Sequence, residues 1–196
     1  MKTKSIAAMA AATLLFGTAW QAQAAETFEI DQSHTNIVFL VDHLGYSNMV
    51  GEFHEFSGSF TFDPDDVTNN KVEMVIKTDS VDTDHEKRDD HLRSPDFFNT
   101  AEFPEMTFTS TSVEQTGKTT GKITGDLTLL GVTKPVTLDV TFNKMAPHPI
   151  PSYNGVVVAG FSARAKVDRT DFGMQYAAGA IGNELDLIIE VEGHKK

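Results

Sequence analysis

Four side chains in one short, charged segment could bind a metal ion or transfer a proton. Asp84, His85, Asp89 and His91 all lie within residues 81–98, VDTDHEKRDDHLRSPDFF. Imidazoles and carboxylates are ordinary ligands of zinc and related metals. His85 and His91 are six residues apart, however, which places them on different faces of a helix. No His-x3-His pair and no serine nucleophile motif accompanies them. A metal-dependent hydrolase that uses His85, Asp89 and His91 therefore stays an alternative interpretation.

Helix-forming chemistry offers a second explanation for these charges. Thr83 and Glu86 have the spacing of a capping box, which starts a helix. Pro95 disfavours helical geometry at the residue before it and should end the helix there. Two acid–arginine pairs are spaced four residues apart, as in helical ion pairs: Asp84 with Arg88, and Asp89 with Arg93.

The apolar residues of the same segment suggest what the helix covers. Leu92 is the apolar residue of the predicted helix, and Phe97 and Phe98 follow directly after Pro95. One interpretation is a helix that lies across a barrel opening while the phenylalanines reach inward. The other is an ordinary crossover whose phenylalanines anchor it in the core. The sequence pattern does not choose between them.

Most of the remaining chain alternates apolar and polar residues with the period of a β-strand. The last run shows it: Leu185, Leu187, Ile189 and Val191 share one face, opposite Glu184, Asp186, Glu190 and Glu192. The pattern predicts about eight strands, each with one apolar face. Such strands hide that face, and leave no open edge, when they close into an antiparallel barrel. We expect an all-β, eight-stranded antiparallel barrel with one or two short helices at its end, with a two-sheet sandwich as the alternative. A loop rich in Gly and Ala, residues 171–183, is either a flexible mouth loop or a close-packed one.

The first 24 residues have the features of an export signal. Lys2 and Lys4 precede an apolar run that is too short to span a bilayer, and Ala22-Gln23-Ala24 is a cleavage motif. We predict a signal peptide at 1–24, cleavage after Ala24, and one domain at 25–196 located in the periplasm. The chain has no cysteine, which excludes thiol catalysis and disulfides. Its net charge of −12 makes nucleic acid an unsuitable partner.

Several motifs resemble those of the YceI family of exported bacterial proteins. They are HLGYS at 43–47, FSG at 56–58, EKRDDHLRSPDFF at 86–98, GDLTL at 125–129 and GVTKPV at 131–136. The resemblance extends over the mature chain. It implies a lipocalin-like barrel with an elongated pocket for polyisoprenoids, including isoprenoid quinones. It brings no established catalytic activity and no required cofactor beyond the bound lipid. A homodimer, and transient contact with inner-membrane proteins, are compatible with it.

The resulting prediction is a periplasmic binding or carrier protein, not an enzyme, that encloses a long isoprenoid lipid. A ligand-free interaction protein with a solid barrel is a further alternative. A polar head group is expected near His43, Tyr46, His85, Arg88 and His91. Apolar side chains of the inward-facing strand positions and of the helix end are the predicted ligand contacts, although each could equally pack the core: Ile37, Phe39, Val41, Phe60, Met74, Ile76, Leu92, Phe97, Phe98, Phe108, Leu127, Leu129, Leu138, Val140, Phe161, Ala163, Leu187 and Ile189.

Overall fold

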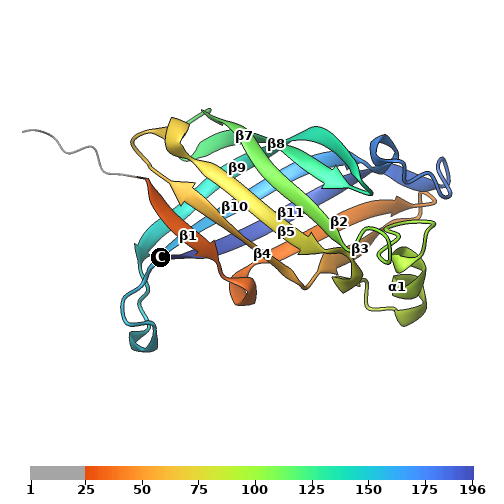
Figure 1. Ribbon diagram of the computed structural model, residues 1–196, viewed down its shortest axis with the longest axis horizontal. Coiled ribbons are helices and arrows are strands. Elements are labelled where there is room, and N and C mark those ends of the chain that lie inside the picture. The colour runs from red at the N-terminus through yellow and green to blue at the C-terminus, as the bar shows by residue number, and fades with distance from the viewer. Residues whose placement is uncertain (1–24) are drawn as a thin grey trace, which may run out of the picture.

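The computed structural model describes residues 25–196, which form a β-barrel with one α-helix (Figure 1). The predicted signal peptide at 1–24 lies outside the described residues. The helix, α1, is Glu86–Arg93. The strands are β1 (Glu26–Ile30), β2 (Asn36–His43), β3 (Ser47–Phe53), β4 (Phe56–Phe62), β5 (Lys71–Lys77), β6 (Val81–Asp82), β7 (Glu105–Gln115), β8 (Thr120–Leu129), β9 (Val132–Pro147), β10 (Val157–Asp168) and β11 (Ile181–Lys195).

The barrel is antiparallel and closed by eight strands in the order β1-β4-β5-β7-β8-β9-β10-β11, because β1 also pairs with β11. β2 pairs with β11 and also with β3. At one end of the barrel these two strands therefore extend the wall. The short β6 then adds to β3. The predicted all-β, eight-stranded antiparallel barrel with a short helix at its end is confirmed.

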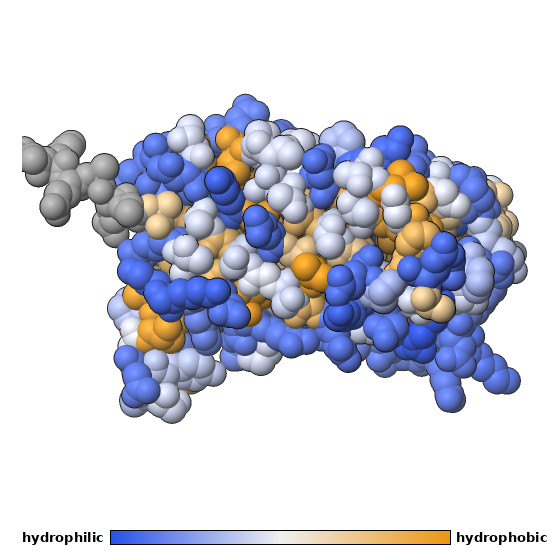
Figure 2. Space-filling view, in the orientation of Figure 1, coloured by the Kyte–Doolittle hydropathy of each residue, from blue (hydrophilic) through white to orange (hydrophobic). Residues whose placement is uncertain are grey.

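The period-two pattern sets which side chains point inward. On β11, Leu185, Leu187 and Ile189 face the interior, whereas Glu184 and Glu190 face outward and pair with basic residues of β10. In the view of Figure 2 the outer surface is mainly hydrophilic, with apolar atoms only in scattered patches. None of the helices in residues 25–196 has the length and apolar character needed to cross a bilayer.

A buried hydrogen-bond network fixes the start of α1, and it differs from the predicted capping box. The N-cap is His85, not Thr83, and its side chain accepts a hydrogen bond from the Arg88 backbone N–H. Thr83 instead donates from its backbone N–H and its hydroxyl to the buried carboxylate of Asp89, at 2.9 and 2.5 Å. Burial of Asp89 explains the difference, because a buried carboxylate needs donors close by.

The two predicted helical ion pairs are also wrong. Arg88 donates to the carbonyl oxygen and the hydroxyl of Thr83, at 2.6 and 2.7 Å. Arg93 donates to the carbonyl oxygens of Asp79 and Val81, both at 2.8 Å. Both arginines therefore attach the helix to the residues that precede it, whose backbone carbonyl groups need hydrogen-bond donors.

Replacing Asp89 with alanine should destabilise the barrel by about 1–3 kcal/mol, because two buried donors of Thr83 lose their acceptor. The matched control is Asp90→Ala, since the Asp90 side chain is exposed and meets Arg93 at 3.4 Å. Loss of such a surface pair costs about 0–1 kcal/mol. Urea unfolding followed by circular dichroism measures both changes. Equal unfolding free energies for the two variants would contradict the network described.

Candidate ligand-binding cavity

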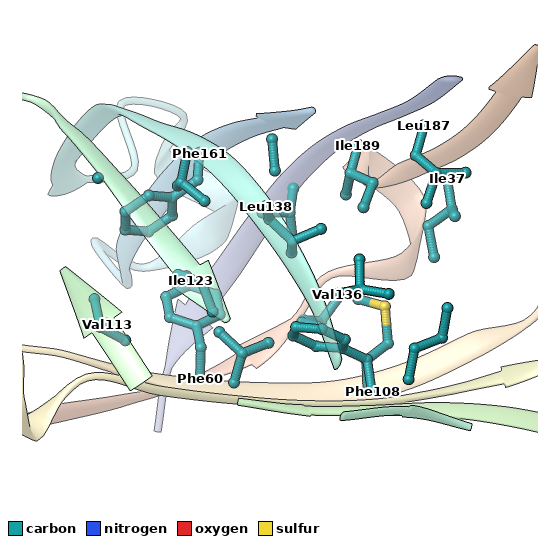
Figure 3. A pocket seen from close by; sticks show the side chains of 18 of the residues that line it. Ile37, Phe60, Phe108, Val113, Ile123, Val136, Leu138, Phe161, Leu187 and Ile189 are labelled. Carbon is teal, nitrogen blue, oxygen red and sulfur yellow. The ribbon is translucent and has the colours of Figure 1, made fainter. Parts of the chain in front are cut away.

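An elongated cavity of about 430 Å³ runs through the interior of the barrel. Its wall comes from the inward faces of β1 to β5 and β7 to β11, and Figure 3 shows some of these side chains from close by. The sticks drawn there carry carbon and sulfur, without nitrogen or oxygen. A cavity with this lining can hold an apolar molecule but offers no polar group along its middle for chemistry.

Most of the predicted ligand contacts lie in this wall. Those that line the cavity are Ile37, Phe39, Phe60, Met74, Ile76, Phe98, Phe108, Leu127, Leu129, Leu138, Val140, Phe161, Ala163, Leu187 and Ile189. Their contact with a ligand stays a prediction. For the residues on strands, the alternation of inward and outward side chains had predicted this position inside the barrel.

Val41, Leu92 and Phe97 lie outside the cavity lining. Val41 pairs with Leu185 near the end of β2, and Leu92 packs against the hydrophobic core from α1. Phe97 is buried among other rings, with centroid distances of 5.0 Å to His91 and 5.2 Å to Tyr176. Of the two phenylalanines after the helix, only Phe98 reaches the cavity.

Several lining residues were not among the predicted contacts. Val72 and Val136 share the inward faces of Met74 and Leu138, so the same alternation could have found them. Phe62 and Phe142 also belong to the wall and form a ring cluster with Phe161, at 5.0 to 5.4 Å between centroids. This cluster gives one part of the lumen an aromatic surface.

Apart from Arg169, the polar lining residues gather at one end of the cavity, at the β4–β5 connection, the β7–β8 hairpin and the strand ends beside them. They are Thr61, Asn70, Lys71, Glu114, Gln115, Lys118, Thr119 and Thr120. Most of them are exposed. The cavity therefore opens to solvent at this end, and a polar head group would meet both acidic and basic side chains there.

The opposite end is closed by buried side chains, among them Phe98, Met174 and Arg169. The Phe98 ring packs edge-on against Phe53 at 5.4 Å, and α1 lies at this end beside β6 (Figure 1). The interpretation of the helix segment as a barrel closure therefore fits the structure. The predicted head-group residues, His43, Tyr46, His85, Arg88 and His91, do not line the cavity. Contact of these residues with a head group stays a prediction, and it requires a mouth on the helix side of the barrel.

Arg169 holds the closed end together. Its side chain is buried and donates to the carbonyl oxygens of Gly182, Met174, Tyr176 and Ile181, at 2.9 to 3.3 Å. Burial lowers the pKa of Arg169 from its usual value. Two of these bonds, to Met174 and Tyr176, anchor the Gly- and Ala-rich loop between β10 and β11. Gly173 and residues 178–180 of this loop are exposed, so it is anchored but not close-packed along its length.

The charged residues of α1 do not form one site. His85 caps the helix, Asp89 accepts hydrogen bonds from Thr83, and His91 pairs with Asp96 at 2.9 Å. Each side chain thus has a different structural partner. The predicted metal cluster of the alternative hydrolase, His85, Asp89 and His91, is not assembled in the described residues.

Glycines opposite phenylalanines keep the lumen open. Phe39 on β2 pairs across the strands with Gly51 on β3, and a Cβ at Gly51 would lie 2.2 Å from the Phe39 ring. The Phe108 ring lies over Gly125, which is two residues from its direct cross-strand partner Leu127, and a Cβ at Gly125 would lie 2.4 Å from it. Each large ring therefore folds flat against the wall where a side chain is missing, and does not fill the lumen.

Gly51→Ala should narrow the cavity, because the atoms nearest to the new methyl group all belong to the movable Phe39 ring. A ring pushed inward should displace one or two methylene-sized units of an apolar ligand and weaken its binding roughly tenfold. Titration with an isoprenoid quinone measures the change. Phe39→Leu in the same chain should restore binding, and an unchanged affinity in Gly51→Ala would contradict this role of the glycine.

Comparison with known proteins relates this geometry to a family. The family model described as a YceI-like domain matches residues 28–193. Protein YceI of Escherichia coli O157:H7 is 46% identical over 192 residues, which cover 97% of each chain. The crystal structure of the Campylobacter jejuni YCEI protein is 34% identical, with a TM-score of 0.69 over 79% of this chain and 90% of that one.

A more distant structure shares the fold alone. It is a polyisoprenoid binding domain from Saccharophagus degradans, 13% identical, with a TM-score of 0.64 over 86% of this chain and 98% of that one. The shared barrel therefore persists where most side chains differ.

Proposed function

The chain belongs to the YceI family, and we propose that it is a periplasmic binding or carrier protein that encloses a long-chain isoprenoid lipid in its barrel. The observation that carries the proposal is the apolar cavity, open at the β7–β8 hairpin and closed at the α1 end. A blind, apolar channel with a polar mouth suits an amphiphile with one long tail. The polyisoprenoid binding described for the S. degradans domain supports the same ligand class.

Hydrophobic burial alone is enough to drive such binding. Each methylene-sized unit that leaves water contributes about 0.8 kcal/mol, so a tail of many units binds without specific polar contacts. Side chains such as Met74 can adapt to the irregular shape of a branched tail. The protein then needs no catalytic group, and its role is to keep an insoluble molecule dispersed in water.

The aromatic cluster near the mouth favours a quinone as the head group. Phe62, Phe142 and Phe161 contact one another in tilted and edge-on geometries, just inside the polar residues of the β4–β5 and β7–β8 connections. Aromatic faces and edges of this kind pack well against another planar ring. A quinone ring could lie here, with its oxygens directed toward the solvent at the mouth.

Native mass spectrometry of protein purified from the bacterial periplasm tests the proposal. We expect an added mass equal to one isoprenoid lipid per chain, released by organic solvent and identified in the extract. The protein stripped of lipid should take up one isoprenoid quinone again. A chain that emerges empty and also fails to bind added quinones would refute the proposal.

A further inference from the structure

A group of metal-ligating side chains lies outside the barrel, away from the cavity. Asp31 and His34 belong to the turn between β1 and β2, and Glu192 lies on β11. One ligand atom from each of the three lies within 4.8 Å of the other two. The β1–β11 pairing brings them together, because the Asp31 backbone N–H donates to the Glu192 carbonyl oxygen at 2.9 Å.

The turn holds the Asp31 carboxylate in one orientation. Its Oδ1 accepts hydrogen bonds from the Ser33 backbone N–H at 2.9 Å and the Ser33 hydroxyl at 2.7 Å. Its Oδ2 therefore faces two imidazoles, with His34 Nδ1 at 2.6 Å and His194 Nε2 at 3.4 Å.

A hollow of about 290 Å³ adjoins this group, between β11 and the β9–β10 connection. His34 and Glu192 line it, and so do Glu190 and His148. Gly160 on β10 stands opposite Glu192 in the sheet and leaves the space that a side chain would fill. The hollow therefore provides room for a bound ion, for water, and for further nitrogen and oxygen ligands.

A tyrosine of the β9–β10 connection positions two of the nearby imidazoles. The Tyr153 ring stacks on His148 at 3.7 Å and meets His194 edge-on at 5.9 Å. Figure 1 shows this connection hanging beside the C-terminus and β1. The β1–β2 turn, the end of β11 and the β9–β10 connection thus meet at this one place.

We propose that Asp31, His34 and Glu192 bind a divalent transition metal ion such as Zn²⁺, with His194 as a further ligand. Zinc accepts imidazole nitrogen and carboxylate oxygen at about 2.0–2.2 Å. The side chain of His34 is half exposed and can rotate to meet such a distance. Calcium and magnesium prefer oxygen-only sites, so the imidazoles select against them.

His54, a histidine outside this group, provides the control for the proposed metal site. His54 Nε2 also lies between two carboxylates, 3.5 Å from Glu52 and 3.2 Å from Asp82. It lies at the break between β3 and β4, and its cluster does not bring three ligand atoms as close together as the Asp31 group does. If any exposed histidine beside two acids bound zinc, His54 would bind it as well.

Calorimetric titration of the tag-free protein, residues 25–196, with zinc chloride tests the site. The wild-type chain and His54→Ala should each bind one Zn²⁺ with the same affinity. His34→Gln and Glu192→Gln preserve side-chain size, and each should weaken binding about tenfold or more, in line with the loss of one ligand. Zinc should raise the melting temperature of the wild-type protein, and calcium should not.

Three results would overturn the proposal: no saturable zinc binding by the wild-type chain, undiminished binding by both glutamine variants, or an equal loss in His54→Ala. Circular dichroism establishes that each variant is folded. Quinone binding should be the same in all four proteins, because the site lies outside the cavity. Failure of the metal site is therefore distinct from failure of the lipid-binding function.

Discussion

Replacing Ala163 with phenylalanine is expected to weaken isoprenoid binding about two hundredfold while the barrel remains folded. Ala163 on β10 lies between Val140 on β9 and Ile189 on β11, and all three line the cavity. A phenyl ring at this position would occupy the middle of the lumen and block the tail from reaching the closed end. Loss of about four methylene-sized contacts at about 0.8 kcal/mol each weakens binding by about two hundredfold.

A phenylalanine introduced on the outer face of the same strand is the control. Lys166→Phe adds an equal ring to β10 at an exposed position, where Lys166 pairs with Glu184 and Asp186. Titration with an isoprenoid quinone should give the wild-type affinity for Lys166→Phe and an affinity about two hundredfold lower for Ala163→Phe. If Ala163→Phe keeps the wild-type affinity, the ligand does not occupy the lumen; if it unfolds, position 163 is close-packed core.

Removal of the Arg169 side chain should have the largest effect on stability. Four carbonyl oxygens accept hydrogen bonds from this buried guanidinium, two in the β10–β11 loop and two at the start of β11. Arg169→Ala leaves them without that donor, and at about 1–3 kcal/mol for each group that stays buried the total loss should reach about 3–5 kcal/mol. Arg169→Lys should recover only part of it, because an ammonium group cannot reach carbonyls on several sides.

Urea unfolding measures this loss of stability. Arg164→Ala, on strand β10 just before Arg169, is the matched control variant. Arg164 is exposed and pairs with Glu190, so its removal should cost no more than about 1 kcal/mol. An Arg169→Ala protein as stable as Arg164→Ala would show that the loop is held by other contacts. Protease cleavage within residues 173–182 should also accelerate in Arg169→Ala, since the loop loses its anchor.

The barrel and most of its interior could be predicted because they follow from local alternation. Leu185 and Leu187 alternate with Glu184 and Asp186, and a strand with that pattern has one favoured inward face. The registers of the finished sheet were not needed to place Leu138 or Phe161 inside. The closed barrel then follows from the need to bury every apolar face at once.

Features that depend on pairing between distant segments could not be predicted in this way. Thr83 has the sequence of a helix cap, but its hydroxyl serves Asp89 because the helix start is buried. Arg169 carries no periodic signal, since it follows the end of β10 in a short turn. The position of the mouth depends on which loops carry polar side chains toward the lumen, and that requires the three-dimensional arrangement.

Two glycines show the same limit of prediction from sequence. Gly51 and Gly125 look like weak points in strands, where glycine usually disrupts pairing. Only the cross-strand register reveals that Gly51 accommodates the ring of Phe39. The open lumen is therefore encoded in pairs of residues on different strands, and not in either strand alone.

A crystal structure of the chain loaded with an isoprenoid quinone shows directly whether the lipid lies in the lumen. We expect continuous ligand density inside the barrel, with the head group near the β4–β5 and β7–β8 connections and the tail extending toward Phe98. A ligand bound on the outer surface, with the lumen collapsed or filled by protein side chains, would contradict it.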